Sequence, residues 1–169
     1  MLRLPGFIGL QGRKEAEVCR SAFGGNVTGD ITVVVTGGTL DFNIISLGCQ
    51  MARGVNHKVH LLHVIEVPRV LPLRAILTQE AERADKLLKA GQEIAEGIGC
   101  EAVAEIVQAR DAGTAIIDEV KDYHCALLIL GLILEKKQPR EIDKVTSYVL
   151  ANAPCRVWLL EEPIRGLPS

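Results

Sequence analysis

The sequence has no large excess of charge of either sign and no long apolar run. Its 19 basic residues oppose 21 acidic residues, so the net charge is −2 and no overall field attracts nucleic acid or anionic lipid. No stretch approaches the roughly 20 consecutive apolar residues that a membrane helix needs. We therefore expect no nucleic-acid partner and no membrane span.

Paired cysteines are also missing. The chain has neither a CxxC motif nor histidines at zinc-finger spacing, and its cysteines are odd in number and scattered. The five are Cys19, Cys49, Cys100, Cys125 and Cys155. Cys49, Cys125 and Cys155 lie beside apolar runs, where a thiol commonly packs as a small hydrophobe. This pattern predicts reduced, mostly buried cysteines and no metal site.

The length of 169 residues suits one domain, and a hydrophobic content of 48% is enough for a substantial core. Residues 1–30 are rich in glycine and charge without a sustained period, which predicts an N-terminal extension; a short helix over 13–22 is left open. The domain is expected over 31–162 and a tail over 163–169. The first ten residues lack a small-residue cleavage site, so we expect a cytoplasmic protein.

Short β-branched runs alternate with helical patterns along the rest of the chain, which is typical of parallel strands joined by crossover helices. The expected strands are Ile31–Val35, Val59–Ile65, Ala102–Gln108, Ala126–Leu130 and Arg156–Leu160. The expected helices are Phe42–Ala52, Ile76–Ile98, Ala112–Asp122 and Lys144–Asn152. In the first helix Phe42 is expected to face inward, and Asp111 is expected to cap the third.

Four segments together resemble the universal stress protein family. They are "HLLHVIEVPR", "QARDAGTAIIDEV", "ALLILG" and "VTSYVLANAPCRVWLL", and the resemblance covers about Ile31 to Leu160. It implies an α/β, doubly wound fold with a five-stranded parallel sheet in the order 3-2-1-4-5, Rossmann-like and similar to the adenine nucleotide alpha hydrolases. The "IEVPRVLPL" and "ARDAGTAI" segments are similar to a subgroup also found fused behind amino-acid permeases, which leaves a protein or transporter partner open.

This strand order implies a crevice beyond the carboxyl ends of strands one and four, lined by 36–41 and 131–143. In the family, members that bind ATP carry an Asp after strand one. After strand four they carry a motif that opens with two glycines and closes with Gly and then Ser or Thr, so that backbone amides approach the phosphates. Here Thr36 holds the Asp position, Gly131 keeps the first glycine, Leu134 replaces the second, and Asp143 and Lys144 hold the closing positions.

Two interpretations of the crevice follow. In the first it is a vestige and the domain works through protein contacts, because the carboxylate of Asp143 caps the helix whose amides would bind phosphate. In the second a basic loop acts as a phosphate clamp for ATP or AMP. The candidate nucleotide residues are Thr36, Gly37, Gly38, Val64, Gly131, Lys136, Lys137, Arg140, Asp143 and Lys144. Either way, we expect ATP to bind weakly.

Catalytic chemistry is not indicated. His60 and His63 lie on opposite faces of one strand by its period of two, so they cannot share a metal ion. Thr146 and Ser147 have no His and Asp placed to activate them. We therefore expect a non-enzymatic regulatory or interaction domain. An apolar edge strand favours a homodimer that pairs through Arg156, Val157, Trp158, Leu159 and Leu160.

Overall fold

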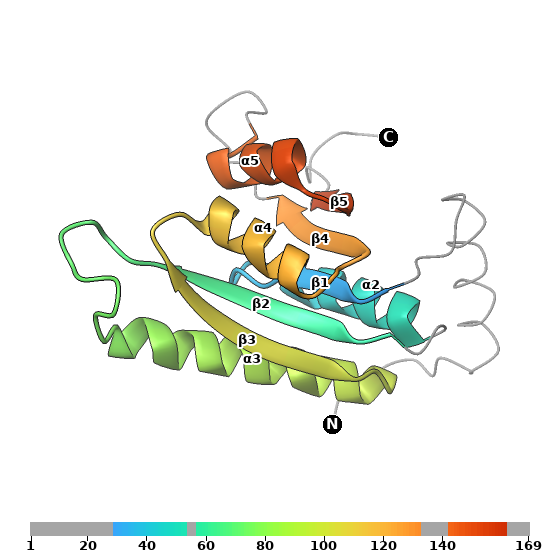
Figure 1. The fold of residues 1–169 in the computed structure, drawn as a ribbon. Helices are drawn as coiled ribbons and strands as arrows, with labels where there is room; N and C mark the ends of the chain where they lie inside the picture. The colour runs from blue at the N-terminus through green and yellow to red at the C-terminus, as the bar shows by residue number, and fades with distance from the viewer. Residues whose placement is uncertain (1–28, 54–56, 133–141, 162–169) are drawn as a thin grey trace, which may run out of the picture.

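The structure is a computed structural model that describes residues 29–53, 57–132 and 142–161 (Figure 1). These residues form five strands and four helices in alternation. The strands are β1 (Ile31–Val34), β2 (Val59–Glu66), β3 (Ala102–Ala109), β4 (Leu127–Leu132) and β5 (Arg156–Glu161). The helices are α2 (Asp41–Arg53), α3 (Thr78–Ile98), α4 (Ala112–Asp122) and α5 (Lys144–Asn152).

All five strands are parallel and belong to one sheet in the order β3-β2-β1-β4-β5. This confirms the expected fold class and strand order. The central strand β1 is buried along its whole length, as its apolar and threonine sequence predicts for a strand covered on both faces. Ile31 of β1 pairs with Val59 of β2 on one side and with Leu127 of β4 on the other.

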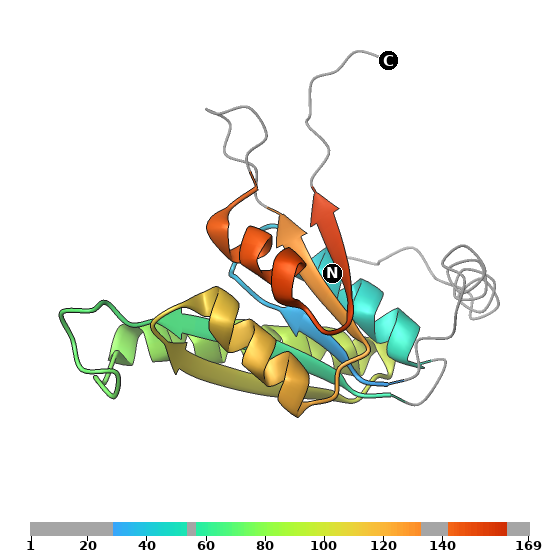
Figure 2. The same cartoon turned by 45° about the horizontal axis from the view of Figure 1, so that its top comes forward.

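Helices cover both faces of the sheet. The helices α2 and α3 pack on one face and α4 and α5 on the other, as the two views show (Figures 1 and 2). Each face has its own apolar cluster: Ile44, Ile45 and Leu61 belong to the first, and Leu62 and Ile116 to the second. No helix in the described ranges is both long and apolar enough to cross a membrane.

One packing prediction is wrong. Phe42 was expected to face inward, but its side chain is 60% exposed. Because α2 begins at Asp41, Ile44 and Ile45 occupy the inward face of the first turns and are 0% and 1% exposed. Phe42 precedes Ile44 by two positions, which places it on the far side of a helix with 3.6 residues per turn.

The other differences concern the ends of elements. Strands β2 to β5 each extend one or two residues further at their carboxyl ends than predicted, whereas β1 ends one residue earlier, at Val34. The long helix α3 begins at Thr78 rather than Ile76, whose side chain is 90% exposed. The predictions for 1–28 and 162–169 concern residues outside the described ranges.

Candidate functional site

The candidate site lies where the carboxyl ends of β1 and β4 meet. The two strands are neighbours in the sheet, with Val33 of β1 opposite Ile129 of β4. The helices that follow them cover opposite faces of the sheet, since α2 packs on one side and α5 on the other. A doubly wound sheet commonly binds its ligand at such a point. The parallel pairing of β1 and β4 places 36–41 and 131–132 at the same edge, whereas most of the predicted lining segment 131–143 lies outside the described residues.

The turn after β1 is organised around the carboxylate of Asp41. Its Oδ2 accepts a hydrogen bond from the Gly37 amide at 2.7 Å. Its Oδ1 lies 3.3 Å from the amide nitrogen of Thr36 and 3.4 Å from the Thr36 hydroxyl. Gly37 has a φ of +85°, a conformation that glycine adopts without strain. Two backbone donors of this turn, the amides of Thr36 and Gly37, thus already have an anionic partner within the chain.

Asp41 was not among the candidate residues of the sequence analysis. The available signal was an acidic residue in the first turn of a helix, three residues after the glycine pair Gly37 and Gly38. That signal predicts favourable placement near a helix N-terminus, but it does not show that the carboxylate reaches back to amides of the preceding turn.

Gly131 and Val64 serve packing. A Cβ built on Gly131 would lie 3.2 Å from the Cβ of Leu40, so this glycine permits the turn after β1 to pack closely on β4. Leu40 is itself 6% exposed. Val64 is half-buried in β2 and packs against the apolar cluster under α4 and α5. Gly38 is half-buried in the turn, where its carbonyl accepts from the Asp41 amide at 3.3 Å.

The start of α5 is capped by Asp143, as predicted. The Oδ1 of Asp143 accepts from the Thr146 amide at 2.9 Å, and its Oδ2 accepts from the Thr146 hydroxyl at 2.6 Å. Asp143 has the extended backbone of an N-cap residue. Thr146 is 3% exposed, so its hydroxyl is not accessible to a substrate. Lys144 follows with an exposed side chain.

A second cap of the same design begins α4. Asp111 accepts from the amide and from the hydroxyl of Thr114, each at 2.8 Å. The hydrogen bond from the Thr114 amide, together with that from the hydroxyl, lowers the pKa of the Asp111 carboxyl below its ordinary value of 3.8. Asp111 follows β3, an edge strand, so it lies away from the junction of β1 and β4. The two Asp-x-x-Thr caps differ chiefly in which strand they follow.

The remaining candidates of the basic clamp are not tested. Lys136, Lys137 and Arg140, together with Leu134, lie outside the described residues. Lys144 is the one clamp residue within them.

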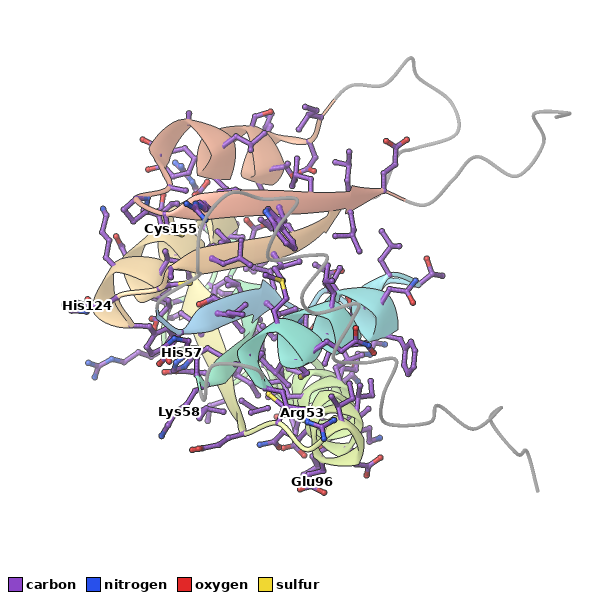
Figure 3. The ribbon with its side chains drawn as sticks, turned by 90° about the vertical axis from the view of Figure 1, so that its right-hand side faces the viewer. Arg53, His57, Lys58, Glu96, His124 and Cys155 are labelled. Carbon is purple, nitrogen blue, oxygen red and sulfur yellow. The ribbon has the colours of Figure 1, made fainter. Side chains whose placement is uncertain are left out.

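Two of the histidines, His57 and His124, lie at the opposite edge of the sheet, because they precede β2 and β4. In Figure 3, β1 and β5 run from left to right, and His57, Lys58, His124 and Cys155 are labelled on the left, where they precede β2, β4 and β5. His57 accepts from the Gly29 amide at 3.1 Å, and His124 lies 3.1 Å from the Asp122 carbonyl. Within the described ranges, no three or more His, Cys, Asp or Glu residues are grouped as a metal site would require.

Two further histidines have separate partners, as the strand period predicts. The Nε2 of His60 lies 3.0 Å from Asp30, whereas the Nδ1 of His63 lies 2.7 Å from the Val35 carbonyl. Partial burial alone would raise the pKa of Asp30, but hydrogen bonds from His60 and from the Lys58 amide hold it below its ordinary value of 3.8.

The four described cysteines are free. Cys49, Cys100 and Cys125 are buried and Cys155 is half-buried, in agreement with the prediction of thiols that pack as small hydrophobes. Cys19 lies outside the described residues.

Among the described residues, carboxylates of the chain accept from the Gly37 and Thr146 amides at this site. Two turns at the carboxyl edge have amides of the kind that bind phosphate, and in each turn a carboxylate of the chain accepts from them. A phosphate that approached these amides would have to displace Asp41 or Asp143 and would be repelled by its charge.

Residues 29–161 match the sequence model of the universal stress protein family. No curated protein matches the chain.

Solved structures of universal stress proteins share the fold. One from Archaeoglobus fulgidus is 15% identical with a TM-score of 0.67, and the match covers 78% of this chain and 98% of that one. The Archaeoglobus fulgidus protein in complex with dAMP is 14% identical, with a TM-score of 0.64 over 79% of this chain and 98% of that one. An Arabidopsis thaliana protein with AMP bound is 19% identical, with a TM-score of 0.61 over 84% of this chain and 97% of that one.

Proposed function

Because the chain belongs to the universal stress protein family, we propose that it is a non-catalytic regulatory or interaction domain that does not bind ATP in the usual manner of that family. The observation that carries the proposal is the occupation of the crevice amides by the chain's own carboxylates. Asp41 accepts from Gly37 after β1, and Asp143 accepts from Thr146 at the start of α5. Both carboxylates oppose an incoming phosphate.

The absence of a catalytic role is part of the same proposal. A nucleophile must reach its substrate, but the Thr146 hydroxyl is buried and bound to Asp143. The Ser147 hydroxyl lies 3.4 Å from the Ile142 carbonyl, which cannot act as a base. His60 and His63 are engaged with other groups.

The proposed assembly is a homodimer through β5. This strand is one of the two edges of the sheet, and an unprotected edge is a template for pairing. The side chains of Val157 and Leu159 pack on one cluster of the domain and those of Trp158 and Leu160 on the other. Pairing would therefore use the strand backbone, with Arg156 and Glu161 exposed at its ends. The proposed interaction role also includes binding to another protein, such as a transporter.

A nucleotide-binding sensor is the second candidate. It is favoured by the solved relatives with dAMP and AMP, which share this fold. In this alternative Lys136, Lys137, Arg140 and Lys144 would hold the phosphates of ATP or AMP in place of the glycine motif.

Mass spectrometry of the purified, denatured chain separates the two candidates, because a retained nucleotide is then detected directly. We expect no AMP or ATP in amounts comparable to the protein, and calorimetry should give an ATP affinity no better than high micromolar. A copurified nucleotide at one molecule per chain would overturn the proposal in favour of the sensor.

A further inference from the structure

The connection from β2 to α3 exposes apolar side chains. Residues 68–77, with the sequence PRVLPLRAIL, form a loop that projects beyond the sheet on the left of Figures 1 and 2. Val70 is 89% exposed and Ile76 90% exposed, while Leu71 and Leu73 are 38% and 46% exposed. An apolar cluster that the domain itself leaves in water commonly marks a contact with a partner or a membrane.

This 68–77 loop is held in shape from another element. The guanidinium of Arg110, at the end of β3, donates to the carbonyls of Val67 at 3.1 Å, of Pro68, and of Leu71 at 2.7 Å. Two backbone hydrogen bonds within the loop each close a turn. The Leu71 amide donates to the Pro68 carbonyl, and the Ala75 amide donates to the Pro72 carbonyl. The backbone is therefore constrained although four of its apolar side chains are exposed, which reduces the entropy lost on docking.

The charge of the loop differs from that of the whole chain. Arg69 and Arg74 are both exposed, and no acidic residue occurs between Glu66 and Glu80. Glu66 itself is engaged at the base of the loop, where it accepts from the Ala112 amide at 2.9 Å. The net charge of −2 gives no general attraction to anions, but this projecting segment combines two cations with exposed aliphatic side chains.

We propose that the 68–77 loop docks on the surface of an anionic lipid bilayer, with its aliphatic side chains in the interface and Arg69 and Arg74 against lipid phosphates. Apolar groups flanked by basic residues bind such surfaces through burial and electrostatic attraction together. The proposal is independent of whether the crevice binds a nucleotide.

Vesicle flotation with the full chain tests it. Wild-type protein should float with phosphatidylcholine vesicles that contain phosphatidylserine and remain behind with phosphatidylcholine alone, and high salt should weaken the binding. Replacing both Val70 and Ile76 by Ser should abolish flotation. Arg69→Gln and Arg74→Gln should each lower the partition coefficient about fivefold.

A matched control uses exposed apolar residues elsewhere. Phe42→Ser combined with Leu150→Ser, at positions 60% and 45% exposed, should float as the wild type does. Thermal unfolding of every variant verifies that it is folded. The proposal would be overturned if the wild-type protein floated with neither kind of vesicle, or if the loop variants and the control variant floated to the same extent. If binding is absent and the loop variants instead change the oligomeric mass, the loop is a protein contact.

Discussion

Replacing Asp143 should increase the affinity of the chain for ATP. Two replacements separate the effect of its negative charge from the effect of its hydrogen bond with the Thr146 amide. Asp143→Asn removes the charge and keeps a cap, because Asn and Asp are about equally good at this position. A phosphate charge about 4 Å from the carboxylate meets about 1 kcal/mol of repulsion in bulk water and about 4 kcal/mol at the effective dielectric near a protein surface. Because the side chain of Asp143 is exposed and solvent screens its charge, we use the bulk-water value of about 1 kcal/mol. It corresponds to about a fivefold gain in affinity per unit of phosphate charge.

Asp143→Gly should gain more, since it also releases the Thr146 amide that the carboxylate holds at 2.9 Å. Glycine at an N-cap costs only about a few tenths of a kcal/mol relative to Asp, so the variant should remain folded. Isothermal titration calorimetry with ATP measures the affinity of each protein, and urea unfolding measures its stability. The expected order of affinity is wild type, then Asp143→Asn, then Asp143→Gly.

Asp111→Asn is the matched control. Asp111 has the same two hydrogen bonds to a threonine three residues later, but it begins α4 after the edge strand β3. Its replacement should leave ATP affinity unchanged. Two results would refute the reasoning: low-micromolar ATP binding by the wild type that Asp143→Gly does not alter, or an equal gain from Asp111→Asn.

Three further outcomes can be measured on the same protein. Gly91→Ala should lower the free energy of unfolding by about 1–3 kcal/mol, because the added Cβ would lie 2.9 Å from Leu61 Cδ1. Gly97→Ala in the same helix meets nothing within 4 Å and should raise the free energy of unfolding by about 0.5 kcal/mol. Urea denaturation that finds Gly97→Ala less stable than Gly91→Ala would contradict this prediction. The folded pKa of Asp30 is depressed, so its stabilising contribution is present above pH 3.8 and is lost as the pH falls through the folded pKa. The difference in unfolding free energy between wild type and Asp30→Asn should therefore narrow below that pH, and a difference that widens would be inconsistent with the depressed pKa. Light scattering at micromolar concentration should give twice the chain mass of 18.3 kDa, and a monomer mass would exclude the β5 dimer.

The sequence predicted the architecture well because its signals are local. The bounds of α4 and α5 agree to the residue, since each helix begins directly after an aspartate whose side chain caps it. The continuous apolar and threonine run of β1 likewise predicts a strand covered on both faces, and all four of its residues are buried. Sequence patterns were less reliable where apolar residues are exposed: Phe42 was expected to face inward and Ile76 to begin the long helix, yet both side chains are in solvent.

The candidate site was predicted in part. The cap by Asp143 follows from its position immediately before a helical pattern. The bonds from Asp41 to the preceding turn do not, because they depend on the curvature of the chain between Thr36 and the helix. The shape of the 68–77 loop is set by Arg110, which is distant in sequence and contacts it only once β2 and β3 are paired.

The pairing of β1 with β4 has a consequence for how the chain is made. Ile31 is synthesised well before its partner Leu127, because β2, α3, β3 and α4 lie between them in the chain. Until then β1 can pair with β2, but its other edge has no strand beside it. Non-local parallel pairing is slow, and an unpaired apolar edge is prone to association. A nascent chain that stalls before β4 should therefore depend on chaperones, and truncation within α4 should give an aggregating product rather than a smaller folded domain.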